Sequence, residues 1–112
     1  MILEKLTKQQ AYQLYLENKD RVLKEKNESF NLELESKKKL ILDKINYNSI
    51  NGYTSLDYNT YLLSNELVYE LIDYFKSLGY LVSKTYVFGY IISIRIFWGE
   101  KTLWNKIKYL LF

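Results

Sequence analysis

Apolar residues recur at helical spacing through the first half of the chain. Thr7 and Gln10 are placed as a capping box, in which a threonine hydroxyl and a glutamine amide satisfy backbone N–H groups at the start of a helix. The following residues keep a helical period and predict a first helix over about 8–26, with apolar positions at Ala11, Leu14, Tyr15, Val22 and Leu23.

Residues 28–47 carry two overlapping patterns. The apolar residues between Phe30 and Leu34 alternate as a strand would, but a longer helical stripe runs from Phe30 to Ile45. The many glutamates and lysines of this stretch are good helix formers. We therefore expect a second helix over 28–47, or a kinked continuation of the first, ended by the Asn51-Gly52 turn.

Residues 64–78 have the clearest helical signature. Ser64 is an N-cap residue, and the apolar positions that follow form one broad stripe. Gly79 sits at the position just past the helix end, with Tyr80 placed to touch Phe75 in a Schellman arrangement. Every local signal in this segment predicts the same element.

Three stretches rich in tyrosine, threonine and β-branched residues predict strands, at 53–58, 80–86 and 90–98. The third strand is the most apolar, so we place it in the centre of a mixed sheet with strand order 1-3-2. A terminal helix over 100–112 completes an α+β fold with two N-terminal helices. The chain is expected to form a single domain over 1–112, with a helical segment at 1–50, a β-α-β-β core at 51–99 and the terminal helix.

Arg95 interrupts the apolar third strand. Alternation places it on a mixed face, opposite the uniformly apolar face that should pack on the 64–78 helix and that carries Tyr90, Ile92, Ile94, Ile96 and Trp98. The N-terminal helices or a second subunit would cover the mixed face. Arg95 could pair with a carboxylate such as Asp57 on the neighbouring strand, or lay its stem on Phe97 with its head in water.

Two sharper hypotheses remain for the same arginine. Arg95 and the nearby tyrosines Tyr53, Tyr58 and Tyr86 could line a concave site for a small anionic ligand, because guanidinium binds phosphate and carboxylate groups through paired hydrogen bonds. Alternatively, Arg95 could contact a protein partner. At the end of the chain, an exposed Trp104 and Phe112 would form a dimer or partner patch, whereas buried copies would pack the terminal helix on the sheet.

Composition removes most catalytic chemistry. The chain has no cysteine and no histidine, so thiol nucleophiles, disulfides, imidazole bases and nearly every zinc or iron site are excluded. The four glycines fall at turns and caps and form no phosphate-binding fingerprint. We therefore expect a protein that is not an enzyme and that holds no metal and no cofactor.

Charge and hydropathy limit the classes of partner that are possible. The net charge of +3 is spread along the chain, so nucleic acid is not an expected partner. The longest apolar stretch is too short to cross a membrane, and no signal peptide is evident. The expected partner is a protein, a second copy of the chain included, in a soluble intracellular setting.

The layout resembles a set of small proteins encoded by bacteriophages and other large DNA viruses. The likeness lies in TKQQAYQLYLENKDRVL, the NG turn, YTSLDY, and LSNELVYELIDYFKSLGYLVSKTY followed by YIISIRIFWG. Members often finish at a strand end like I-S-W, where this chain has Ile96-Phe97-Trp98 and an added terminal segment. The resemblance implies a viral source and a three-stranded α+β domain, and it supplies no activity or site residues.

These observations favour a viral accessory protein that acts by binding, as a homo-oligomer, and that inhibits a host or defence component in the host cytoplasm. Two alternatives stay open. The protein could be a structural component of the virion, with its helices and terminal aromatic residues making contacts. It could also be a sponge that holds an anionic nucleotide around Arg95.

Overall fold

The computed structural model describes residues 5–100. The chain divides into two compact units, Met1–Glu33 and Leu34–Phe112. The predictions of a terminal helix over 100–112 and of contacts by Trp104 and Phe112 lie outside the described residues. The boundary between the units falls inside the predicted helical segment 1–50.

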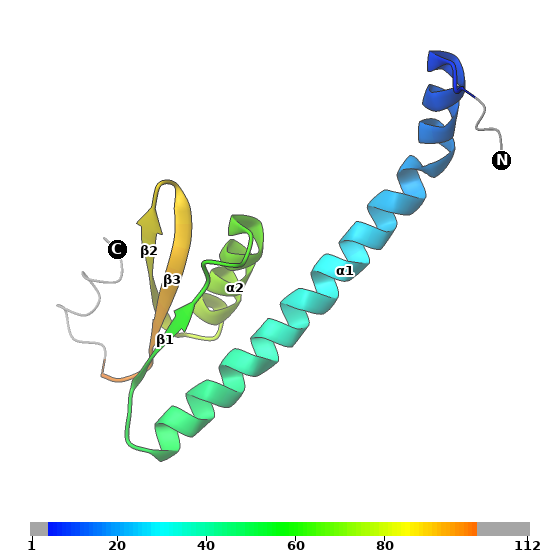
Figure 1. Cartoon of the computed structure of the whole chain (residues 1–112). Coiled ribbons are helices and arrows are strands. Elements are labelled where there is room, and N and C mark those ends of the chain that lie inside the picture. The colour runs from blue at the N-terminus through cyan, green and yellow to red at the C-terminus, as the bar shows by residue number, and fades with distance from the viewer. Residues whose placement is uncertain (1–4, 101–112) are drawn as a thin grey trace. The chain divides into compact units, whose positions relative to one another are not determined.

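One helix, α1, runs over Lys8–Ile50 (Figure 1). Its start is the predicted capping box: the Thr7 N–H donates to Oε1 of Gln10 at 3.0 Å, and the Gln10 N–H donates to Oγ1 of Thr7 at 3.2 Å. The helix ends at the predicted turn, where Gly52 takes a φ of 85°. The prediction of two N-terminal helices is wrong, because no proline or glycine interrupts the chain before Gly52 and the alternating stretch is absorbed into the helix.

The sheet has three strands in the predicted order β1-β3-β2, and the fold is α+β (Figure 1). The strands are β1 (Ser55–Asn59), β2 (Leu81–Val87) and β3 (Tyr90–Phe97). β3 pairs with both neighbours in the antiparallel sense, so the predicted mixed sheet is wrong. The physical reason is the strand order itself: β1 and β2 never meet, because the strand that returns between them is antiparallel to each.

Helix α2 (Asn65–Ser77) confirms the predicted caps. Oγ of Ser64 accepts from the Leu67 N–H at 3.2 Å. At the other end the Tyr80 N–H donates to the Phe75 carbonyl at 3.1 Å and Gly79 takes a φ of 96°, which is the Schellman arrangement. The rings of Phe75 and Tyr80 meet edge to face, with centroids 5.8 Å apart.

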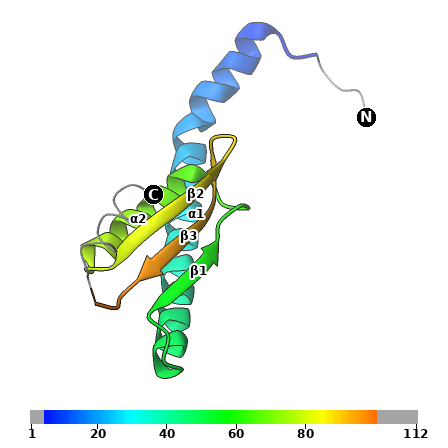
Figure 2. The ribbon, with the colours of Figure 1, turned by 90° about the vertical axis from the view of Figure 1, so that its left-hand side faces the viewer.

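The core lies on one face of the sheet. Figure 2 shows α2 and the last part of α1 on this face, behind the three strands. The part of α1 that belongs to this unit buries Leu34, Ile41 and Ile45. The opposite face of the sheet carries Arg95, and no described helix lies on it. The expectation that the N-terminal helices cover the Arg95 face is therefore wrong for residues 34–50, which lie on the side of α2.

A bulge changes which residues of β3 face the core. Thr85 pairs with Ser93 but Tyr86 pairs with Ile91, so Ile92 is an extra residue on β3. Ile94 and Ile96 face the core as predicted, but Ile91 joins them and is buried, while Tyr90 is exposed. The predicted grouping of Tyr90 with the apolar face is wrong, because a single extra residue reverses the alternation beyond it.

Candidate functional site

Arg95 forms a paired contact with Asp57 on the outer face of the sheet. Nε of Arg95 donates to Oδ1 of Asp57 at 2.6 Å, and one terminal guanidinium nitrogen donates to Oδ2 at 3.0 Å. The two residues lie directly opposite each other on β1 and β3. This confirms the first of the sequence alternatives, the carboxylate pair on the neighbouring strand. The fork that would bind an anionic ligand is therefore engaged by a carboxylate of the chain itself.

The structure does not bring the predicted tyrosines together around Arg95. Tyr58 is the neighbour of Asp57 on β1 and pairs with Ile94, so it points to the core side of the sheet. The side chain of Tyr86 is also on the core side, because its hydroxyl reaches Tyr69 of α2. Tyr53 lies before β1 and is exposed. The concave tyrosine-lined site around Arg95 thus has no counterpart in the arrangement of these side chains.

The turn between β2 and β3 contains Phe88, the one residue other than glycine within residues 5–100 that has a positive φ. Val87 pairs with Tyr90, so the turn consists of Phe88 and Gly89 alone. Both have positive φ, 51° and 81°, as a type I′ turn requires. Such turns favour asparagine or glycine, and a bulky residue there is strained. The side chain of Phe88 is 97% exposed, so burial of the ring does not offset this strain.

Two sets of hydrogen bonds hold the turn in place. Asn65, the first residue of α2, donates from Nδ2 to the Gly89 carbonyl at 2.9 Å and accepts at Oδ1 from the Ile91 N–H at 3.1 Å. Lower on the hairpin, the hydroxyls of Tyr69 and Tyr86 lie 2.6 Å apart. This hydrogen bond raises the pKa of Tyr69 and lowers the pKa of Tyr86. The strained turn is therefore tied to α2 by side-chain hydrogen bonds.

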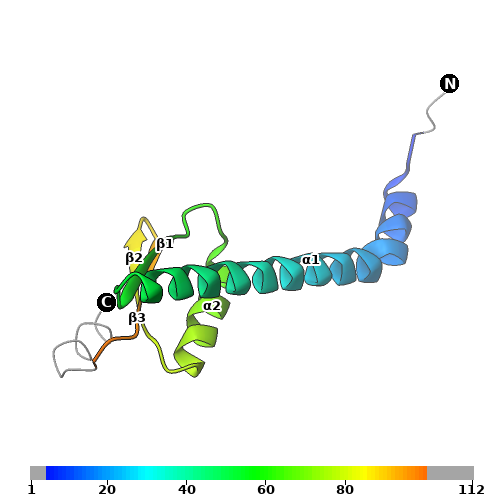
Figure 3. The same ribbon diagram turned by 90° about the horizontal axis from the view of Figure 1, so that it is seen from below.

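The loop between β1 and α2 reaches the same end of the sheet (Figure 2; Figure 3). The buried Thr60 fastens this loop to β3: its N–H donates to the Ile92 carbonyl at 2.9 Å and its hydroxyl to the Ile91 carbonyl at 3.0 Å. Stretches 59–65 and 86–93, which build this end, contain no charged residue. We call the exposed apolar residues of these stretches the tip surface: Tyr61, Leu62, Tyr86, Val87, Phe88 and Tyr90. Tyr86 lies on the core side of the hairpin, whereas Val87 and Tyr90 lie on its opposite side.

Sequence reasoning found only one member of the tip surface, Tyr86. Neither Phe88 nor Asn65 was among the predicted site residues. A signal for Phe88 was present, because a phenylalanine occupies the position before Gly89 where a two-residue hairpin turn favours asparagine. Asn65 offered no such signal, since its role depends on a contact 24 residues away along the chain.

Replacing Phe88 with asparagine is expected to stabilise the domain by about 1 kcal/mol, because asparagine adopts positive φ more readily than an aromatic residue. Urea unfolding followed by circular dichroism measures the change. The matched control is Leu62→Asn, another exposed tip residue, whose own position has no positive φ. A Phe88→Asn protein less stable than the native chain would show that the ring supports the fold.

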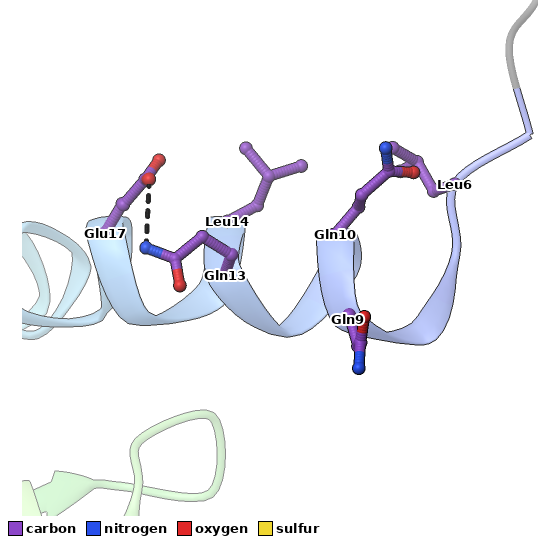
Figure 4. Close-up of a pocket in the computed structure, with 6 residues that line it drawn as sticks. All are labelled: Leu6, Gln9, Gln10, Gln13, Leu14 and Glu17. Atoms are coloured by element: carbon purple, nitrogen blue, oxygen red, sulfur yellow. Dashed lines mark hydrogen bonds between the residues drawn. The ribbon is translucent and has the colours of Figure 1, made fainter.

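Other features of the described residues give less support to a binding site. A hollow on the first turns of α1 is lined by Leu6, Gln9, Gln10, Gln13, Leu14 and Glu17, with the Gln13 amide donating to Glu17 at 3.2 Å (Figure 4). Its lining comes only from the first turns of α1 and from Leu6 just before them, which gives a ligand no enclosed space. Within residues 5–100, no group of acidic side chains is gathered to hold a metal ion, and no helix is long and apolar enough to cross a membrane.

No protein-family model, no curated protein and no solved structure matches the chain.

Proposed function

We propose that this chain is a non-enzymatic accessory protein of a bacteriophage or other large DNA virus that acts by binding a protein in the host cytoplasm, where it inhibits a host or defence component. The binding site is the tip surface. The observation that carries the proposal is Phe88, a fully displayed aromatic ring on a strained and anchored turn. The viral source rests on the sequence resemblance.

The tip surface has the composition of the centre of a protein–protein interface. Such centres are rich in aromatic side chains and depleted of charge, and a few aromatic anchors supply most of the binding energy. Three tyrosines and a phenylalanine lie here, in stretches without a charged residue. Strained backbone is often found where a residue is kept for function and the surroundings hold it in place. Asn65 and Thr60 provide that support, so little ordering entropy is lost when a partner binds.

The nucleotide-sponge alternative has less support. Its central residue, Arg95, already pairs with Asp57 through two hydrogen bonds, and the tyrosines nearest to it in the sheet point to the other face. A ligand carboxylate or phosphate would have to displace Asp57. The virion alternative stays open, because a structural component of the virion would also need exposed contact surfaces.

Affinity capture from infected cells, with the native chain as bait, tests the proposal. We expect a host protein to be retained by the native chain and lost with Phe88→Asn, which removes the ring but keeps the turn. The matched control is Leu32→Asn, which removes another exposed apolar side chain, 74% exposed, from α1. We expect this control to capture the partner normally.

Equal capture by Phe88→Asn and the native chain would contradict the assignment of the tip surface. Recovery of the chain in purified virus particles, with no host protein retained, would favour the virion alternative. A bound compound with nucleotide absorbance, lost with Arg95→Ala, would favour the sponge.

A further inference from the structure

The first unit of the chain cannot bury its own apolar residues. Its described part, residues 5–33, is a short lead-in followed by one helix, and a single helix has no second element to pack against. Isolated helices are marginal in water, since most helical stability in proteins comes from packing an apolar face. The unit has one alanine and several asparagines, so intrinsic propensity alone does not stabilise its helix.

An apolar seam runs along this helix. Its members are Tyr12, Leu16, Leu23 and Phe30, which are four, seven and seven residues apart. With 3.6 residues per turn, these spacings keep all four side chains on one narrow sector of the helix. Tyr12 and Leu23 are 60% and 58% exposed. Leu16 is 36% exposed, and Phe30 is half-buried.

The same spacing continues into the part of α1 that belongs to the second unit. Leu34, Ile41 and Ile45 follow Phe30 at intervals of four, seven and four residues, and all three are buried. The sector that packs on the domain core in the second unit is thus the sector left exposed in the first. The exposed seam thus repeats the spacing of the buried residues of α1, and within residues 5–33 no second element lies against it.

We propose that the seam at residues 12–30 pairs with the same seam of a second copy of this chain. Two helices that each carry an apolar residue every seven positions pack well together, because the side chains of one helix then insert regularly between those of the other. Residues 5–33 contain six basic and five acidic side chains, so two copies carry little net charge against each other. Tyr15 and Val22 lie beside the seam and are also exposed, so they widen the apolar surface that a second helix would cover.

The lysines beside the seam favour an antiparallel pair. Lys19 and Lys26 lie on the same sector as the seam residues. In a parallel, in-register pair, each lysine would face the same lysine of the other chain, and the two positive charges would repel each other. In an antiparallel pair with Tyr12 opposite Phe30, Lys19 lies opposite Leu23 and Lys26 opposite Leu16. Their stems can then cover the leucines while the ammonium groups reach water.

Sedimentation velocity over a concentration series tests this proposal with two exposed leucines of the same helix. Leu23 lies in the seam, and Leu32 is nine residues further on, on the opposite side of the helix. We expect the native chain and Leu32→Lys to form the same dimer. The dimer of Leu23→Lys should have a dissociation constant at least about tenfold higher. Because both leucines are exposed, neither change should disturb the fold of one chain.

Cross-linking tests the alignment, since the chain contains no cysteine. A mixture of Tyr12→Cys and Phe30→Cys chains should form a disulfide between the two, and neither chain alone should do so. A native chain that stays monomeric at all concentrations, or equal dissociation of the two lysine variants, would overturn the proposal. Self-linking of Tyr12→Cys alone would overturn the antiparallel alignment. Phe88→Asn should leave the dimer unchanged, so this test is independent of the tip surface.

Discussion

Replacing Ile41 with alanine is expected to lower the free energy of unfolding by about 3 kcal/mol, the usual cost of truncating a fully buried isoleucine. Ile41 is 0% exposed, although it lies on a helix whose other faces are mostly in water. Small domains are stable by only about 5–15 kcal/mol, so this loss is a large share of the total. Urea unfolding monitored by tryptophan fluorescence measures it, because Trp98 packs on Tyr80 within the same unit.

Leu32→Ala is the matched control for Ile41→Ala. Leu32 is on the same helix but 74% exposed, and its truncation should change the free energy of unfolding by less than about 0.5 kcal/mol. Similar effects of the two substitutions would show that α1 after Leu34 is not part of the domain core.

Replacing Thr60 with valine is expected to cost about 2 kcal/mol. Valine keeps the branched shape of threonine but removes the hydroxyl that donates to the Ile91 carbonyl, which leaves a buried acceptor without this partner. The effect should appear in urea unfolding and as faster amide exchange around the bulge at Ile92, because the loop and the bulge are fastened together at this point.

Thr60→Ser is the comparison for Thr60→Val. It keeps the hydroxyl and removes one methyl group, so it should cost about 1 kcal/mol. If the valine variant is as stable as the native chain, the hydroxyl contributes nothing and Thr60 is buried for its shape alone.

The elements with several agreeing local signals could be predicted from the sequence. The caps of α2 follow from Ser64 and Gly79, and the central place of β3 follows from its apolar run. The sequence left open whether residues 28–47 form a second helix or continue the first, and the continuation is observed because no proline or glycine lies between them. The bulge at Ile92 could not be predicted, since one extra residue in a strand leaves the local composition unchanged.

The candidate site was predicted less well, for a geometric reason. The Asp57–Arg95 pair could be expected because it needs only two facing residues on neighbouring strands. The tip surface joins the β1–α2 loop to the β2–β3 turn through contacts of Thr60 and Asn65 with residues about 25 to 30 positions away. Which loops meet at one end of a sheet depends on the whole topology, and spacing along the chain does not show it.

The affinity of the captured partner for the native chain and for Phe88→Asn tests the central claim most directly. Isothermal titration of the purified partner with each protein gives the two dissociation constants. A central aromatic anchor is worth at least about 2 kcal/mol, so we predict binding at least about 30-fold weaker for Phe88→Asn, although that variant is the more stable protein. Equal dissociation constants would contradict the claim that this chain binds its partner through the exposed ring of Phe88.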